Sequence, residues 1–198
     1  LQYLTEMKSL EGLQISTNLT DAGFNQICKL NSLKVLFVRG KNRITDAVLS
    51  HISNLKALER LEFSSSGFNG EGLKYLCELP SFRCLNIGGD LSNDAFLYLK
   101  DAASLRTLLV GGLGFNDQGM KNISALSQLE HFSAHWVTNI TDEGAAYLKD
   151  MPNLKSLDLE QAKLTDAAMP DIAKIKTLEY LHLPNHGLTD AGLQYISE

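Results

Sequence analysis

The chain has 198 residues, of which 44% are hydrophobic and 8% aromatic, so it can bury a long aliphatic core. Its 18 Lys and Arg residues against 23 Asp and Glu give a formal net charge of −5, and no basic stripe appears, which argues against nucleic acid as a partner. No apolar stretch approaches the roughly 20 residues of a membrane-spanning helix, so membrane insertion is not expected.

One pattern recurs along the whole chain: L-x-x-L-x-L, a short turn and a helix start. In the first unit Leu13 and Ile15 have the period-two spacing of a strand, and Phe24 and Ile27 have the spacing of a helix. The second leucine-like position falls 23, 25, 24, 23, 24, 25 and 24 residues apart at Leu13, Leu36, Leu61, Leu85, Leu108, Phe132, Leu157 and Leu181. A period of roughly 20 to 29 residues with a strand and a helix is typical of a solenoid whose units stack around a shared core.

The units define one domain over residues 1–198. They are expected to start near residues 10, 33, 58, 82, 105, 129, 154 and 178, after a partial unit over residues 1–9. Neither end carries a capping module: Leu1, Leu4, Met7 and Leu10 resemble the tail of a preceding helix, and the last helix stops at Glu198. Because solenoid ends need polar caps, we expect the chain to be a fragment of a longer protein.

The residue after each turn hydrophobe is one that can cap a helix N-terminus: Thr20, Thr45, Asn69, Ser92, Asn116, Thr141, Thr165 and Thr189. Six of these are followed by an aspartate, which favours the positive end of a helix: Asp21, Asp46, Asp117, Asp142, Asp166 and Asp190. Because a carboxylate recurs at one position of the repeat, these aspartates are predicted to be structural and not catalytic. Glycines three residues after the cap are expected to permit close stacking: Gly23, Gly72, Gly119, Gly144 and Gly192.

The outer segments 19–24, 140–145 and 188–193 carry the pattern I/L-T-D-x-G followed by an apolar residue, and the chain resembles leucine-rich repeat proteins of the I/L-T-D-x-G-L type. Similar segments occur in the cysteine-containing repeats of F-box ubiquitin-ligase receptors and in protozoan and bacterial arrays. The resemblance implies a right-handed α/β horseshoe with a concave parallel β-sheet and convex helices, acting as a non-enzymatic protein-interaction scaffold.

Two other functions stay open. One is the substrate-recognition part of an F-box-type ubiquitin ligase, although the turn position that this subclass fills with Cys or Asn holds Thr17, Gly40 and Ser65 here. The other is a structural spacer in a larger assembly.

Side chains alternate across a strand, so the residues between the buried leucines are expected to face the concave surface and contact a protein partner. One candidate neighbourhood is apolar and cationic and consists of Val35, Phe37, Arg39 and Arg60. Leu109 is a further candidate outside this neighbourhood. A second neighbourhood combines histidines, aromatic residues and acids: His131, His135, Trp136, Asp158, Glu160, Tyr180 and His182. We favour the second, because Trp and Tyr are enriched in interface hot spots and it holds the chain's single Trp.

Two irregular units carry further expectations. A second interpretation of Trp136 is that it folds over the edge of its own repeat and fills the space left where Ala134 replaces a large strand residue. Pro170 lies five residues past the Thr165 cap and removes a helical hydrogen-bond donor, so a short or distorted helix is predicted there.

No cofactor, metal or catalytic site is predicted. A zinc site needs three or four converging ligands. His131 and His135 are four residues apart, which on an extended strand separates them by ~13 Å, so they cannot bind one ion together. The glycines of residues 111–114 lack the Gly-Lys-Ser/Thr ending of a phosphate loop and repeat those of residues 88–89, so they are interpreted as a tight corner. No serine near a histidine is expected to have an orienting third group.

Cysteine usage favours a reducing compartment. Cys28 and Cys77 share one helical position two units apart, which separates them by at least ~10 Å, and Cys84 lies on a strand, so no disulfide is expected. An odd number of thiols indicates a cytoplasmic protein, which we expect to be monomeric. A secreted or cell-surface location stays open because the chain contains glycosylation sequons at Asn18, Asn122 and Asn139.

Overall fold

The computed structural model describes residues 6–65, 67–89, 91–112 and 114–196, except for the side chains of Lys41 and Ser65. In this part of the chain, eight parallel strands follow one another in a single sheet in chain order. They are β1 (Gly12–Ser16), β2 (Val35–Asn42), β3 (Arg60–Ser65), β4 (Cys84–Gly89), β5 (Thr107–Gly111), β6 (His131–His135), β7 (Ser156–Asp158) and β8 (Tyr180–His182). Leu1 and Leu4, assigned above to a preceding helix, and Glu198 lie outside the described residues.

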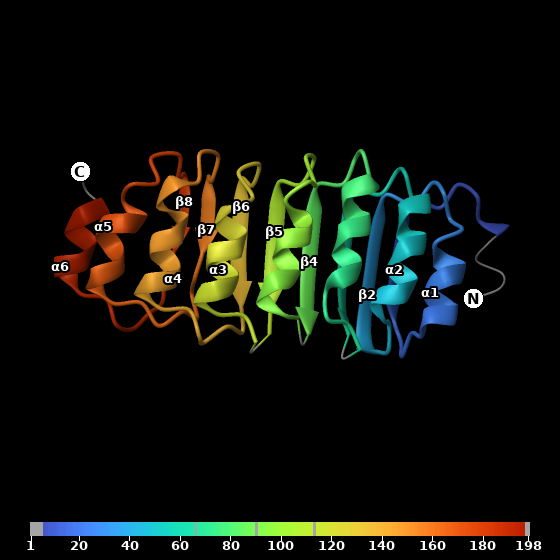
Figure 1. Ribbon diagram of the computed structural model, residues 1–198, viewed down its shortest axis with the longest axis horizontal. Helices are drawn as coiled ribbons and strands as arrows, with labels where there is room; N and C mark the ends of the chain where they lie inside the picture. Colours follow the sequence, from blue (N-terminus) through green and yellow to red (C-terminus); the bar gives the residue numbers. More distant parts are fainter. Residues whose placement is uncertain (1–5, 66, 90, 113, 197–198) are drawn as a thin grey trace.

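Helical segments connect the strands and cover one face of the sheet (Figure 1). The α-helices are α1 (Asp21–Ile27), α2 (Asp46–Leu49), α3 (Asp117–Ser124), α4 (Asp142–Ala146), α5 (Met169–Ile172) and α6 (Asp190–Leu193). The 3₁₀ segments are η2 (Ser50–Asn54), η3 (Glu71–Glu78), η4 (Asn93–Leu99), η5 (Tyr147–Asp150), η6 (Asp166–Ala168) and η7 (Gln194–Ile196). A 3₁₀ helix rises about 2.0 Å per residue against about 1.5 Å for an α-helix, so it spans the repeat with fewer residues. None of the described helices is long and apolar enough to cross a membrane.

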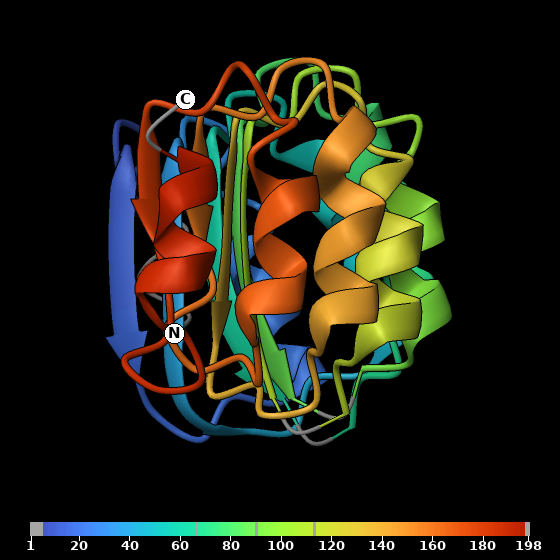
Figure 2. The same ribbon diagram turned by 90° about the vertical axis from the view of Figure 1, so that its left-hand side faces the viewer.

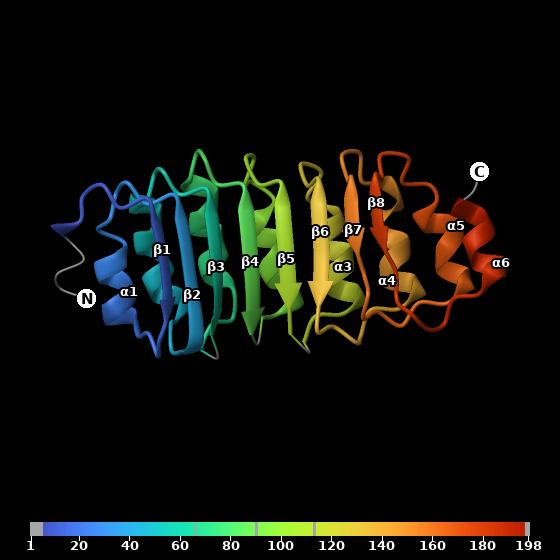
Figure 3. The ribbon, with the colours of Figure 1, turned by 180° about the vertical axis from the view of Figure 1, so that it is seen from behind.

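The array is curved. In the view along its length, both ends lie toward the sheet side and the middle repeats bulge toward the helical side (Figure 2). The sheet therefore lines the concave face, and none of the described helices covers it (Figure 3). The predicted α/β horseshoe with an inner parallel sheet and outer helices is confirmed.

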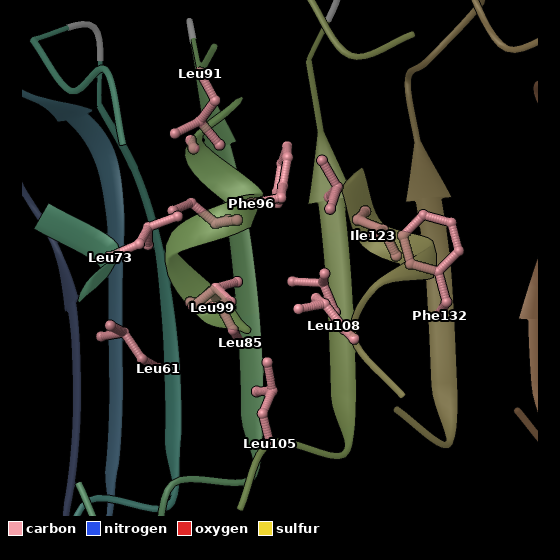
Figure 4. Packing of buried hydrophobic residues seen from close by; sticks show 14 of the residues in the cluster. Leu61, Leu73, Leu85, Leu91, Phe96, Leu99, Leu105, Leu108, Ile123 and Phe132 are labelled. Atoms are coloured by element: carbon pink, nitrogen blue, oxygen red, sulfur yellow. The ribbon is translucent and has the colours of Figure 1, made fainter. Parts of the chain in front are cut away.

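Stacked aliphatic layers fill the space between sheet and helices (Figure 4). The strand register pairs Leu36 with Leu61, Leu61 with Leu85, Leu85 with Leu108 and Leu108 with Phe132. All of these side chains are fully buried. Because truncating a buried leucine to alanine costs roughly 2–5 kcal/mol, this column is a main source of stability.

The recurring aspartates join consecutive repeats on the outer side. The Asp142 carboxylate accepts hydrogen bonds from the backbone N–H of Thr165 at 2.8 Å and from its hydroxyl at 2.6 Å. The same pair of bonds recurs between three other aspartates and the threonine of the next repeat: Asp21 with Thr45, Asp117 with Thr141, and Asp166 with Thr189. We call this series, together with Asp46, whose carboxylate accepts backbone N–H groups of the following repeat, the aspartate ladder. The structural role predicted for these aspartates is confirmed, but each carboxylate reaches the following repeat as well as its own helix start.

The structure corrects the predicted capping. The side chains of Asn116, Thr165 and Thr189 accept a hydrogen bond from the first helical turn, as expected. Thr45 and Thr141 make no such bond. Their hydroxyls donate to the aspartate of the preceding repeat, as the hydroxyls of Thr165 and Thr189 also do. The prediction that all eight residues cap their own helix was therefore wrong.

The helix glycines leave room for the ladder. A Cβ atom on Gly144 would clash with the carboxylate of Asp117, and one on Gly192 would clash with that of Asp166. The expectation that a small residue at this position permits close stacking is confirmed for these two repeats.

Pro170 interrupts the outer segment of its repeat. It occupies the first turn of α5, which has four residues and follows the three residues of η6. The short helix that Pro170 predicts is confirmed.

Candidate interaction surface

The concave face displays the residues that alternate with the buried leucines. Along β6, for example, Phe132 and Ala134 are buried, whereas His131 is exposed and His135 is half-buried. The predicted partner-binding residues lie on this face or at the carboxyl ends of its strands: Val35, Phe37, Arg39, Arg60, Leu109, His131, His135, Trp136, Asp158, Glu160, Tyr180 and His182. The strand geometry thus places all of them on one side of the array.

An arginine cluster of Phe37, Arg39, Arg60 and Glu62 lies on β2 and β3. The Arg39 guanidinium donates to both carboxylate oxygens of Glu62, from Nε at 2.7 Å and Nη2 at 3.3 Å, and lies 5.7 Å from the centre of the Phe37 ring. This hydrogen bonding, together with the charge of Glu62, raises the pKa of Arg39. Arg60 Nε donates to Cys84 Sγ at 3.3 Å. Glu62, which sequence reasoning did not select, neutralises Arg39, so this cluster offers less free positive charge than predicted.

A histidine network of Ser133, His135, Asp158 and His182 crosses β6, β7 and β8. The Ser133 hydroxyl donates to Asp158 Oδ2 at 3.1 Å, and His135 Nε2 lies 3.1 Å from the same hydroxyl oxygen. His182 Nδ1 lies 3.2 Å from Asp158 Oδ1. The structure thus pairs His182 with Asp158, and the partner that it shows for His135 is Ser133.

The histidine network corrects the prediction that no serine near a histidine has a third polar group. Asp158 is that group, but the order of hydrogen bonds differs from a catalytic triad, in which the histidine lies between the acid and the nucleophile. Because the single hydroxyl proton of Ser133 is donated to Asp158, His135 must donate through Nε2–H. In this arrangement His135 is not placed to remove the Ser133 proton, so the network orients side chains and does not activate a nucleophile.

Trp136 stands out at the end of β6. Its side chain is 73% exposed, while the next residue, Val137, is fully buried. The interpretation that Trp136 fills the space beside Ala134 was therefore wrong. Its φ of 57° lies in the left-handed region, the region that Gly40 occupies at the corresponding corner of β2. A non-glycine residue there costs roughly 1–2 kcal/mol, so the protein sustains strain to hold an aromatic ring in solvent.

A trough of about 280 Å³ crosses the carboxyl ends of β2 to β6. Its lining includes Ser64, Gly88 and Gly111, which are paired on the three middle strands, and Arg39 and Trp136, which come from the two outermost strands. Its other lining residues include Glu62, Asn86 and His135. Sequence reasoning placed these positions on the concave face but did not select Ser64, Asn86, Gly88 or Gly111. The sequence signal that could have found the trough is the run of small side chains on the strands between the large side chains of Arg39 and Trp136.

The described residues contain no group of three His, Cys, Asp or Glu side chains that could hold a metal ion. The corner glycines behave as predicted: Gly89 and Gly112 have φ angles of 127° and 131°, which favour glycine.

Comparisons with known proteins agree with this architecture. Internalin C2 of Listeria monocytogenes is 21% identical with a TM-score of 0.62, and the match covers 93% of this chain and 76% of that one. A leucine-rich repeat protein of Leptospira interrogans is 19% identical with a TM-score of 0.63, covering 98% of this chain and 54% of that one. The family model described as "Leucine Rich repeat" matches residues 174–197, around β8 and α6. The chain is a leucine-rich repeat protein.

A related sequence comes from Trypanosoma equiperdum and bears the name "Putative adenylate cyclase regulatory protein". It is 32% identical to this leucine-rich repeat chain over 126 residues, which is 64% of the chain. The matched part spans 19% of that protein's length. Leucine-rich repeat proteins are typically non-enzymatic modules that bind other proteins, with the extended concave face of the solenoid as the binding surface.

Proposed function

We propose that this leucine-rich repeat protein is a non-enzymatic interaction scaffold that binds a protein partner on its concave face. The observation that carries the proposal is the exposed ring of Trp136, held at a backbone angle where other repeats use glycine. Strained residues cluster at functional sites, and Trp is among the residues most enriched in interface hot spots.

Other features of the concave face support this proposal. Tyr180 on β8 is 58% exposed. It pairs with Ser156 on β7, which in turn pairs with His131 on β6, so the three residues lie in one row across the sheet. The face therefore combines two exposed aromatic rings with the polar histidine network, a mixture typical of the core and rim of a protein interface. The name of the trypanosome relative, which describes regulation, also fits a module that acts by binding.

The test is affinity capture from a lysate with the intact array and with a Trp136→Ala/Tyr180→Ala/His182→Ala variant. A matched control carries Leu97→Ala and Tyr98→Ala, which remove exposed apolar side chains of η4 on the convex side. We expect one protein to be captured by the intact array and by the control but lost with the concave variant. The captured protein is then purified, and its affinity for all three forms is measured by calorimetry. Equal affinity for the three forms contradicts binding on the concave face.

We also propose a cytoplasmic location, which the free thiols of Cys28, Cys77 and Cys84 support. The sequon at Asn122 argues in the same direction, because that side chain is 6% exposed and its amide donates to the backbone oxygen of Asn93 at 2.9 Å. Fractionation of cells that express a tagged chain tests the location. Glycan on Asn18 in protein from its natural host would contradict it.

A further inference from the structure

We propose that Asn69 is a modification site, at which the side-chain amide converts to aspartate and isoaspartate without an enzyme, and that the carboxylate of Asp46 controls the rate. The co-reactant is water. The inference is carried by the Asn69–Gly70 pair and by the hydrogen bonds that hold this pair at the start of η3. It is independent of the proposed function, because Asn69 precedes a helical segment and does not lie on a strand of the concave face.

The reaction joins two neighbouring residues. The backbone nitrogen of Gly70 attacks the side-chain amide carbon of Asn69, and a new C–N bond forms as the bond to the side-chain nitrogen breaks. That nitrogen leaves as ammonia and takes the proton of the Gly70 N–H with it. Water then opens the resulting cyclic imide at one of its two carbonyl groups, which gives aspartate or isoaspartate. The attack is intramolecular, and a following residue without a Cβ leaves the approach unobstructed.

The fold requires the glycine of this pair but not the asparagine. Gly70 has a φ of 101°, and a Cβ on it would clash with the Cβ of Ala95 in the next repeat. At the position of Asn69 other repeats carry threonine or serine, as at Thr45 and Ser92. Either residue would keep the repeat without a reactive amide, so the pair is not a consequence of packing.

The Asn69 side chain is accessible and its carbonyl is polarised. The residue is exposed, so water reaches the amide and ammonia can leave. Its amide oxygen accepts a hydrogen bond from the backbone N–H of Glu71 at 3.0 Å. This donor stabilises the oxygen as it gains negative charge during the attack. The structure therefore activates the carbonyl group that Gly70 attacks.

The carboxylate of Asp46 slows the reaction in the folded protein. It accepts the N–H of Asn69 at 2.8 Å, that of Gly70 at 3.1 Å and that of Gly72 at 2.6 Å. The imide nitrogen carries no hydrogen, so the bond from Gly70 to Asp46 must be lost before the ring closes. A hydrogen bond to a charged group corresponds to a factor of roughly ten to a hundred, and the folded protein is expected to react more slowly than the unfolded chain by that factor.

Isoaspartate breaks the contact that delayed its formation. In isoaspartate the main chain runs through the side-chain carbon, which lengthens the backbone between residue 69 and Gly70. The N–H groups of Gly70 and Gly72 then no longer match the positions of the Asp46 oxygens. Because ammonia is lost, the change is one-way. The modified fraction therefore records how often the start of η3 has opened.

The test is incubation of the protein at mildly alkaline pH and body temperature, followed by peptide mapping with mass spectrometry. Asn116 is an internal control: its amide oxygen accepts the N–H of Gln118 at 2.9 Å in the same arrangement, but the next residue is Asp117. We expect conversion at Asn69 and none at Asn116 over the same period. In urea, which breaks the contact with Asp46, we expect Asn69 to convert roughly ten to a hundred times faster.

Two variants locate the control of the rate. Asp46→Ala removes the acceptor of the Gly70 N–H, and its matched control, Asp142→Ala, removes the equivalent carboxylate from another repeat. We expect Asp46→Ala to convert Asn69 at least about fivefold faster than the original folded protein and Asp142→Ala to keep the original rate, with circular dichroism confirming that both fold. If Asp46→Ala does not fold, the comparison of the original protein with and without urea decides.

The inference is overturned by any of three results. One is that Asn69 of the folded protein is unchanged after roughly a hundred times the half-life measured in urea. The second is that the folded and the unfolded protein convert Asn69 at the same rate, or that folded Asp46→Ala and Asp142→Ala do so. The third is that Asn116 converts as fast as Asn69, because the glycine would then have no role.

Discussion

Replacing Asp46 with alanine removes the carboxylate that holds the start of the following repeat. This side chain accepts three backbone N–H groups, from Asn69 at 2.8 Å, Gly70 at 3.1 Å and Gly72 at 2.6 Å. Hydrogen bonds to a charged group contribute about 1.5–3 kcal/mol each, but Asp46 is half-buried and water can replace part of the loss. We therefore expect Asp46→Ala to lower the free energy of unfolding by about 2–3 kcal/mol and Tm by about 4–12 °C.

Two variants separate the ladder from the helix dipole. Asp190 occupies the same position at the start of α6, but its carboxylate has no hydrogen-bond partner among the described residues. Asp190→Ala therefore loses only the interaction with the helix N-terminus, which is smaller. Asp46→Asn keeps one acceptor oxygen, and we expect a loss between those of the two alanine variants.

The assay is urea unfolding followed by far-UV circular dichroism, with the slope compared among variants. A lower slope for Asp46→Ala would indicate that the repeats no longer unfold together. If Asp46→Ala and Asp190→Ala differ by less than about 0.5 kcal/mol, the ladder does not join the repeats energetically and the reasoning is refuted.

Three further predictions concern single positions. Gly112→Ala is expected to cost about 1–3 kcal/mol because its φ is 131°, whereas Gly111→Ala should stay within about 0.5 kcal/mol; equal losses in urea unfolding would contradict this. Hydrogen bonds from Thr189 hold the pKa of Asp166 below its ordinary value of 3.8. The stabilisation that the Asp166 carboxylate provides is thus complete above that value and is lost as pH falls through the lower pKa of the folded protein. We therefore expect the Tm of Asp166→Asn to fall less than that of the original protein when the pH is lowered below about 4. Burial raises the pKa of Cys28 to about 12, so iodoacetamide should label Cys28 only in urea, as detected by peptide mapping. Labelling of Cys28 in the folded protein would count against its burial.

The strands and the core could be predicted because their signals repeat in every unit. The period-two spacing of Leu13 and Ile15 recurs at Leu157 and Leu159, and each of these residues lies on the helix-facing side of the sheet. The same alternation predicts which residues face the concave side. It depends only on strand geometry, so the candidate surface could be predicted as a set of positions.

The contacts across that surface could not be predicted in the same way. The bond from Ser133 to Asp158 depends on side-chain rotamers on neighbouring strands, and a linear pattern does not specify these. For Trp136 a usable signal existed, because Gly40 and Gly112 occupy the same corner in other repeats and glycine there indicates a positive φ. The general tendency of Trp to be buried was the weaker guide, since a left-handed corner directs the side chain outward.

The aspartate ladder runs in one direction along the array, because each carboxylate serves the repeat that follows it. Removing a repeat from the amino-terminal side leaves N–H donors of its successor unpaired, whereas removing one from the carboxyl-terminal side leaves a carboxylate that water solvates well. During synthesis on the ribosome, each new repeat emerges beside a predecessor whose carboxylate is already in position, so the order of translation is also the order in which the outer hydrogen bonds can close.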